Sequence, residues 1–379
     1  MLMKLAIVHD YLNQMGGAER VLLTLHEIFP QAPIYTSIYA PELVDPGFGQ
    51  MDVRTTFMQR LPLVHHHHRS FLPLFPFAFE SIDLREYDVV LSMSSGWAKN
   101  VLTRPDTCHI CYCLTPMRFA WSFRDYAPGE GISSWQMGVL GPILSGLRLW
   151  DVAGANRVDA FAAISMGVKR RIEKYYRREA AVIYPPVCTS DYTLDPAHPL
   201  ATQAGDYFLT GGRMIPYKRI DLAIQACNRL KARLVVFGDG RDRARLEAMA
   251  GPTIEFVGRV DDRTKRELLW GCQAFLFPEE ADFGIAPVEA MAAGRPVVAY
   301  GAGGALDTIV DGVTGVHFRQ PAVGAMADAL QRIRRTEWDR EDIARHASRF
   351  DVRTFKEHLG RFVEEQAAAH GGAVAAALK

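Results

Sequence analysis

The sequence predicts an α/β protein of two Rossmann-like domains, each with a parallel β-sheet. Three observations favour this fold class. Short apolar runs alternate with amphipathic helical stretches in both halves of the chain. A polar, proline-containing stretch at 188–206, CTSDYTLDPAHPLATQAGD, separates the two series. The length of 379 residues suits two domains of ordinary size. We therefore expect two such sheets that face a central cleft.

The first domain is predicted to span residues 1–195. Five buried strands are expected, in the sequences KLAIVHD, YDVVLSMS, HICYC, DAFAAIS and AVIYPPV. The stretch GGAERVLLTLHEIF reads as an amphipathic helix with Val21, Leu22, Leu25 and Ile28 on one face. Ser165 is expected to cap the basic helix MGVKRRIEKYYRR. The apolar run at the N-terminus is too short for a signal peptide or a membrane span.

The second domain is predicted to span residues 204–352. Its expected strands are DYFLTGG, RLVVFGDG, IEFVGRV, AFLFPEE and PVVAYG, with helices between them. Strands separated by helices form parallel sheets with right-handed crossovers. Ligands of such sheets bind outside the carboxyl ends of the strands. Residues that follow each strand are therefore the candidates for a binding site.

Composition and motifs exclude several other classes. The formal net charge is zero, so no global field favours nucleic acid. Six cysteines are present, and CHICYC at 108–113 suggests a metal site, but no second Cys/His pair follows at zinc spacing. A buried strand with reduced thiols is the better interpretation, and the four histidines at 65–68 read as a surface turn of a helical stretch. The turn after the first strand lacks G-x-G-x-x-G, which argues against a nicotinamide enzyme.

The stretch GGRMIPYKRID, at 211–221, follows the first strand of the second domain. Gly211 and Gly212 allow a close turn of the backbone at the strand end. Arg213 offers a planar fork for two phosphate oxygens, and Lys218 offers a mobile charge. The pattern predicts a diphosphate site at this edge of the sheet. Taken alone, a solvated arginine and lysine would be an equally good interpretation.

The stretch PEEADFGIAPVEAMAAGRP, at 278–296, predicts a short helix over about 286–293. The backbone N–H groups before this helix would form an anion site; they belong to Phe283, Gly284 and Ile285. Glu289, expected in the first turn, could accept two adjacent hydroxyls, as on a ribose. The alternative is that Glu289 only stabilises the helix dipole, worth about 0.3–1 kcal/mol.

These motifs carry a family resemblance. The order Gly-Gly-Arg-x-x-x-x-Lys, FGDG, FVGRV and DFGIAPVEAMAAGRPVVAY resembles the retaining glycosyltransferases of family 4, which have the GT-B fold. The N-terminal GGAERVLLTLHEIFPQAPIYTSIY and CYCLTPMRFAW are similar to the branch that builds bacterial surface polysaccharides, including lipopolysaccharide. Many members of that branch transfer mannose. The resemblance covers nearly the whole chain.

The resemblance implies roles for individual residues. Arg213 and Lys218 would bind the donor diphosphate and act in catalysis, and Glu289 would hold the ribose. The remaining donor-binding residues would be Gly17, Gly258, Arg259, Val260, Asp282, Phe283, Gly284 and Ile285. Gly16 and Arg118 would lie on the acceptor side. The resemblance also implies that residues 353–379 form a helix that crosses back to the first domain, through Phe355, Leu359 and Phe362, before a frayed Ala/Gly-rich tail.

Two positions depart from the family pattern. The first Glu of the family's Glu-x7-Glu motif should stand at residue 281, which is alanine, although Glu279 and Glu280 lie next to it. In relatives that Glu contacts the donor sugar. Position 114 is leucine where this branch usually has the His of CHTPMR, which lies near the transferred sugar. Both departures put the positioning of the sugar in doubt and leave the nucleotide half of the site intact.

The function implied is retaining transfer of a sugar, first of all mannose from GDP-mannose, with UDP-sugars as the other donor class. The leaving phosphate would take the proton of the acceptor, and no metal or other cofactor is expected because no Asp-x-Asp motif is present. The alternative is a catalytically weakened GT-B protein that binds nucleotide or glycan and serves an assembly.

The acceptor is expected to be an oligosaccharide or lipid-linked glycan. The segments RSFLPLFPFAFE and SSWQMGVLGPILSGLRLW are unusually apolar. They would either pack as core helices or rest on the inner face of the membrane. A cytoplasmic protein, peripheral on the plasma membrane, is therefore expected.

Overall fold

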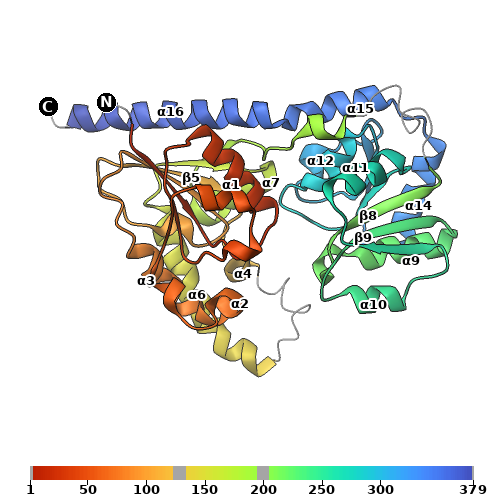
Figure 1. Cartoon of the computed structure of the whole chain (residues 1–379), viewed down its shortest axis with the longest axis horizontal. Coiled ribbons are helices and arrows are strands. Elements are labelled where there is room, and N and C mark those ends of the chain that lie inside the picture. Colours follow the sequence, from red (N-terminus) through yellow and green to blue (C-terminus); the bar gives the residue numbers. More distant parts are fainter. Residues whose placement is uncertain (1–2, 123–133, 194–204, 378–379) are drawn as a thin grey trace. The chain divides into compact units, whose positions relative to one another are not determined.

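The computed structural model describes residues 3–122, 134–193 and 205–377. The chain forms two compact units (Figure 1). The first contains Met1–Tyr184 together with Phe355–Lys379, and the second contains Pro185–Thr354. The first unit thus ends before the predicted boundary at residue 195, because the segment that follows Tyr184 packs with the second unit.

The first unit is built on a seven-stranded sheet with the order β3-β2-β1-β4-β5-β6-β7. All neighbouring strands are parallel. The strands are β1 (Leu5–His9), β2 (Ile34–Thr36), β3 (Val53–Thr55), β4 (Val89–Ser94), β5 (Cys108–Cys113), β6 (Ala160–Ala163) and β7 (Ala181–Val182). The five strands expected from the sequence form. The short outer strands β2 and β3 were not predicted, because three-residue runs carry little periodicity.

Among the described residues, the α-helices of the first unit are α1 (Gly17–Ile28), α2 (Val64–His67), α3 (Phe75–Glu80), α4 (Arg118–Trp121), α6 (Ser134–Ala155) and α7 (Met166–Tyr176). The C-terminal α16 (Val352–Ala377) belongs to this unit from Phe355 onward. Val21, Leu22 and Leu25 of α1 are buried, as its pattern predicts. Ser165 caps α7, since its side chain accepts the N–H of Val168 at 3.1 Å. All six cysteines of the chain are outside disulfide bonds.

A buried polar cluster fixes α6 against its neighbours. The carboxylate of Asp151, on α6, forms a buried ion pair with Lys99. It also accepts the indole N–H of Trp121 at 2.7 Å and the hydroxyl of Tyr176 at 2.8 Å. A carboxylate this deeply buried requires such partners, because an uncompensated charge in the core is very costly. One side chain therefore connects α6, α4, α7 and the turn after β4.

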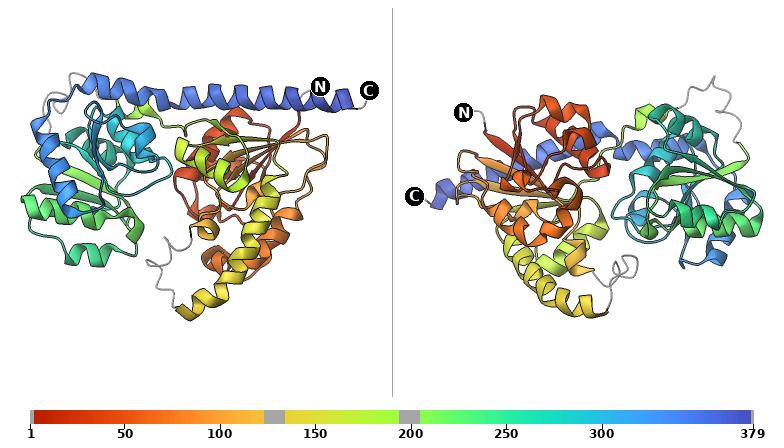
Figure 2. Two further views of the ribbon diagram at one scale, coloured as in Figure 1. Left: turned by 180° about the vertical axis from the view of Figure 1, so that it is seen from behind. Right: turned by 60° about the horizontal axis from the view of Figure 1, so that its bottom comes forward.

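Helix α16 packs along the first unit, as Figure 2 shows in both views. Phe355, Leu359 and Val363 are buried, and the ring of Phe355 lies 5.6 Å from that of Tyr112. Phe362, which the sequence placed on this face, is only half-buried. The tail expected to fray after Glu365 instead stays helical to Ala377, in keeping with the high helix propensity of alanine.

The second unit contains a six-stranded parallel sheet with the order β10-β9-β8-β11-β12-β13. Its strands are β8 (Tyr207–Arg213), β9 (Arg233–Asp239), β10 (Ile254–Gly258), β11 (Phe275–Phe277), β12 (Val297–Tyr300) and β13 (Gly315–Phe318). The five expected strands form, and β13 is an additional strand at the edge. This order places the first strand, β8, between β9 and β11, with crossover helices on both faces.

Helices α9 (Ile220–Leu230) and α14 (Val323–Arg335) cover one face of this sheet, and α11 (Asp262–Gly271) and α12 (Ile285–Ala292) cover the other (Figure 1). The unit also contains α10 (Arg243–Ala248), α13 (Ala305–Thr308) and α15 (Arg340–Ala347). Within the described residues, no helix combines the length and the apolar character needed to cross a bilayer.

The buried His109 on β5 should make the first unit sensitive to acid. Burial, together with the nearby charges of Arg157 and Lys99, lowers the pKa of this imidazole to about 3 from 6.5. As the pH falls below 6.5, the unfolded chain binds a proton that the folded chain does not, so the free energy of unfolding decreases. The decrease approaches about 1.4 kcal/mol per pH unit.

Between about pH 6.5 and pH 5, the free energy of unfolding of the unsubstituted chain should therefore fall by about 2 kcal/mol more than that of His109→Gln. Urea unfolding at the two pH values measures the difference. An identical pH dependence of both proteins would contradict the assignment of a neutral, buried His109.

Candidate functional site

Two of the predicted cations lie at or just after the end of β8 in the second unit. Arg213 is the last residue of β8 and its side chain is exposed. Gly212, before it, has φ of +117°, a conformation that glycine adopts readily. After β8 the chain enters a short 3-10 helix, η8 (Pro216–Lys218), and Lys218 is its last residue. Both cations therefore lie at the carboxyl edge of the sheet, as predicted.

Lys218 already has an anionic partner inside the unit. Its ammonium group forms an ion pair with the carboxylate of Glu279, which is 3% exposed. Glu279 follows β11, and β11 lies beside β8, so the two strand ends bring the charges together. The sequence drew attention to Glu279 only as a neighbour of Ala281. Its contact with Lys218 depends on strand order, which the sequence does not specify.

The ends of β9 and β10 add further charges at this edge. Asp239 ends β9 in register with Arg213. Its carboxylate lies 3.9 Å from Arg243 Nη1 and 3.5 Å from Arg259 Nε. Arg259, predicted to bind donor, follows β10 and its side chain is 84% exposed. Asp239 and Arg243 were not predicted as site residues.

Residues 258–260 form the turn after β10. Gly258 has φ of +73°, so the turn depends on glycine there, and Val260 is half-buried. This turn follows a strand that pairs with β9. The predicted base-binding segment therefore lies at the same edge of the sheet as Arg213.

The loop between β11 and α12 contains the predicted anion site. Helix α12 begins at Ile285, one residue before the predicted start, with Gly284 at φ of +94° before it. Asp282 is half-buried, whereas the side chain of Phe283 is buried, with its ring 5.6 Å from that of Phe350. Any contact of Phe283 with a ligand is therefore a backbone contact.

Glu289 has a different environment from the one predicted. It lies beyond the first turn of α12 and is buried, 3% exposed. Its carboxylate accepts the hydroxyl of Tyr192 at 2.8 Å and the ammonium of Lys265 at 2.5 Å. Tyr192 comes from the 3-10 helix η7 (Thr189–Tyr192), and Lys265 comes from α11. The sequence predicted a carboxylate open to a ribose. It did not predict Tyr192 and Lys265 as partners of Glu289, because both are remote from it in sequence.

The predicted residues of the first unit also follow strand ends. Gly16 precedes α1 as its N-cap and Gly17 is the first residue of α1, in the connection that follows β1. Arg118 begins α4 after β5 and is half-buried. Leu114, which replaces the histidine of the family pattern, is buried directly after β5. The carboxyl edge of this sheet therefore holds all the predicted acceptor-side residues.

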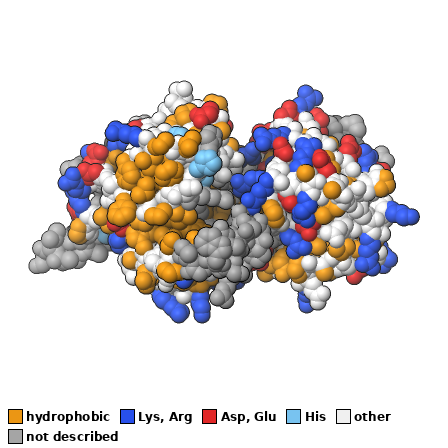
Figure 3. All heavy atoms as spheres, turned by 90° about the horizontal axis from the view of Figure 1, so that it is seen from below, with side chains coloured by type: hydrophobic (Ala, Val, Ile, Leu, Met, Phe, Trp, Pro, Cys, Tyr) orange, Lys and Arg blue, Asp and Glu red, His pale blue; other side chains and the backbone are white. Residues whose placement is uncertain are grey.

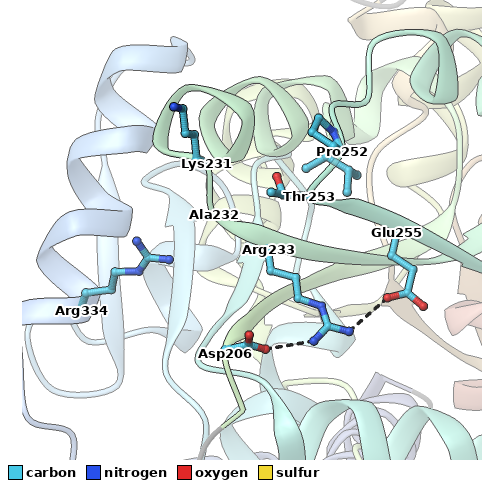
Figure 4. Close-up of a pocket in the computed structure, with 9 residues that line it drawn as sticks. Asp206, Lys231, Ala232, Arg233, Pro252, Thr253, Glu255 and Arg334 are labelled. Atoms are coloured by element: carbon cyan, nitrogen blue, oxygen red, sulfur yellow. Dashed lines mark hydrogen bonds and ion pairs between the residues drawn. The ribbon is translucent and has the colours of Figure 1, made fainter.

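A pocket of about 450 Å³ lies elsewhere on the second unit (Figure 4). Its lining comes from the beginnings of β8, β9 and β10, so it opens at the amino edge of the sheet. Arg233 spans it, with ion pairs of 3.1 Å to Asp206 and 3.3 Å to Glu255. This pocket is separate from the predicted site, which lies at the carboxyl edge.

The chain is similar to known glycosyltransferases in part of its sequence and in its fold. Residues 196–350 match the family described as "Glycosyl transferases group 1". Over 94 residues the chain is 36% identical to the alpha-1,3/1,6-mannosyltransferase ALG2 of Dictyostelium discoideum, covering 24% of this chain and 22% of that protein. Over 106 residues it is 37% identical to a GDP-mannose-dependent alpha-mannosyltransferase of Mycobacterium tuberculosis, covering 28% of each. The chain thus spans less than a third of either relative.

Solved structures show the fold over nearly the whole chain. Anabaena Alr3699/HepE in complex with UDP has a TM-score of 0.68 at 17% identity and covers 96% of this chain and 100% of that one. Sucrose-phosphate synthase from Thermosynechococcus elongatus has a TM-score of 0.72 at 17% identity and covers 97% and 100%. Both are similar in fold, and this confirms the predicted GT-B fold class. Residues 196–350 are accordingly a glycosyltransferase group 1 domain in a chain with the GT-B fold.

Proposed function

We propose that the protein is a retaining glycosyltransferase that uses a nucleoside diphosphate sugar as donor. The observation that supports this most directly is the carboxyl edge of the second sheet. Arg213, Lys218, Arg259 and the N-terminus of α12 each lie at or after the carboxyl end of a strand of this one sheet. Cations and helix amides are the groups that stabilise charge on a departing phosphate.

GDP-mannose is the donor that we propose first. The names of the matched relatives support mannose, and one of them names GDP-mannose as its donor. UDP is the alternative, since the HepE structure contains UDP. The proposed reaction transfers the sugar to the acceptor hydroxyl, whose proton passes to the leaving diphosphate. These residues provide the electrostatic stabilisation for that step, and no metal is part of the proposal.

The proposed acceptor is a glycan, in the lipid-linked form when the protein contacts a membrane. Figure 3 shows hydrophobic side chains gathered on one face of the first unit. The large exposed apolar residues of this region, among those described, lie in the turn before α2, in α3 and in α6: Leu63, Phe77, Ile143 and Leu149. An apolar surface of this kind suits the interfacial region of a bilayer. The segments that the sequence marked as apolar thus contribute both to the core and to the surface.

A binding protein without efficient transfer is the second candidate. Ala281 supplies no carboxylate, and its carbonyl accepts the N–H of Gly304 at 2.8 Å. Glu289 is held by Lys265 and Tyr192. The missing carboxylate at position 281 favours a site that can bind nucleotide more readily than it positions a sugar.

Calorimetric titration of GDP, UDP and ADP tests the donor site. We expect one nucleotide to bind to the unsubstituted protein and to lose most of its affinity in Arg213→Ala, because the diphosphate loses a bidentate partner. Incubation with the matching sugar nucleotide and a glycan acceptor then distinguishes transfer from binding alone. The absence of binding by all three nucleotides would contradict the proposal and favour a role in an assembly.

A further inference from the structure

Three side chains of different chemistry meet at the amino edge of the first sheet. Cys108 is the first residue of β5, Asp159 directly precedes β6, and His370 lies on α16. One sulfur, one carboxylate oxygen and one imidazole nitrogen from these residues lie within 4.8 Å of one another. The proposed donor site belongs to the other sheet, so this cluster is not part of it.

The backbone holds two of the groups in fixed positions. Asp159 Oδ2 accepts the N–H of His109 at 2.7 Å, and the N–H of Asp159 donates to the carbonyl of His109 at 2.8 Å. This pairing orients Asp159 so that Oδ1 lies 3.8 Å from His370 Nδ1. Cys108 is 2% exposed and its position is fixed by the pairing of β5 with β4. The carboxylate and the thiol are therefore positioned by strands, independently of α16.

The contacts within the protein do not account for His370. The distance of 3.8 Å to Asp159 is too long for a hydrogen bond. The other ring nitrogen, Nε2, is buried and makes no hydrogen bond within the described part of the chain. A buried polar atom of this kind calls for a physical explanation, such as an ion or a water molecule.

We propose that Cys108, Asp159 and His370 bind a zinc ion. Thiolate, imidazole and carboxylate are the three ligand types that Zn²⁺ takes in proteins. The Asp159 side chain is 40% exposed, so a water molecule can complete a tetrahedral site. Binding releases the thiol proton to solvent. Because the ligands come from β5, from the residue before β6 and from α16, the ion would fasten the C-terminal helix to the sheet.

Cobalt(II) substitution of the full-length, untagged protein tests this site. A thiolate bound to Co²⁺ gives a sulfur-to-metal charge-transfer absorption, which Zn²⁺ abolishes by displacement. This readout is needed because the histidines at 65–68 could bind Co²⁺ without sulfur. We expect one equivalent of Co²⁺ to produce the band, and Cys108→Ser to remove it. His370→Ala and Asp159→Asn should each weaken Zn²⁺ binding by at least about 10-fold.

Two matched controls are available. Cys188→Ser removes the exposed thiol of the second unit, and His358→Ala removes an exposed histidine of α16. Both should keep the band and the affinity. At equal concentration, Zn²⁺ should also raise the Tm of the unsubstituted protein by more than that of His370→Ala. The proposal fails if the unsubstituted protein gives no sulfur band, if the band survives Cys108→Ser, or if His370→Ala binds Zn²⁺ with unchanged affinity.

Discussion

Replacement of Arg213 by alanine is expected to slow sugar transfer by about 10²–10³-fold, equivalent to about 3–4 kcal/mol of transition-state stabilisation. The guanidinium ends β8 at the edge where negative charge would accumulate on the departing diphosphate. Its side chain is exposed, so the substitution should change the free energy of unfolding by no more than about 0.5 kcal/mol. The effect should therefore appear in the rate and in nucleotide affinity, with little change in stability.

The measurement is the initial rate with the nucleotide sugar that binds in calorimetry, together with a denaturant titration of each variant. Arg229→Ala is the control, because it removes an exposed arginine from α9 of the same unit. Arg213→Lys keeps the charge but loses the planar fork, so its rate should fall between those of the other two. A rate for Arg213→Ala equal to that of the control would remove Arg213 from the proposed mechanism.

Replacement of Glu289 by alanine is expected to destabilise the second unit by about 3–5 kcal/mol. The carboxylate neutralises Lys265, whose side chain is only 14% exposed, at a distance of 2.5 Å. Without Glu289 the ammonium remains in a largely buried site, and the Tyr192 hydroxyl loses its acceptor. The loss of stability should exceed that caused by breaking an exposed ion pair on α11, the helix that carries Lys265. Glu267→Ala breaks the pair with Arg263 and should cost less than about 1 kcal/mol.

The double variant Lys265→Met/Glu289→Leu separates stability from binding. If the unpaired lysine causes the loss, removal of both charges should restore most of the stability. Nucleotide affinity of the refolded double variant then reports whether Glu289 also contacts the ribose. Denaturant unfolding followed by tryptophan fluorescence suits this test, because Trp270 lies on α11 and donates to the carbonyl of Tyr192 at 2.7 Å. If Glu289→Ala were as stable as Glu267→Ala, this would contradict a stabilising buried ion pair between Glu289 and Lys265.

The sequence predicted those parts of the fold that have strong local signals. The central strands, the cap at Ser165 and the apolar face of α1 follow from periodicity and local hydrogen bonding. The cations at the end of β8 were predicted because a residue that follows a parallel strand must lie at its carboxyl edge. Strands β2 and β3 were missed because each has only three residues.

The partners of the site residues could not be predicted in the same way. Lys265 and Tyr192 reach Glu289 from a different helix and from the segment before β8. Glu279 reaches Lys218 because β11 lies beside β8. Such contacts depend on strand order and on how helices pack across a sheet. The sequence therefore predicted which groups are present and left open which of them neutralise one another.

The ion pair between Lys218 and Glu279 has a consequence for selectivity among anions. With Glu279 in place, the ammonium is already neutralised by a tethered carboxylate at high effective concentration. To bind Lys218, chloride or inorganic phosphate must displace the carboxylate of Glu279, and the exchange of one anion for another yields little net binding free energy. In the proposed site, a nucleoside diphosphate would gain further contacts at Arg213 and at the helix amides, so it could compete where a small ion could not. The carboxylate of Glu279 would thus reduce the binding of simple anions to Lys218 and keep the proposed site available to a nucleoside diphosphate in solutions that contain salt.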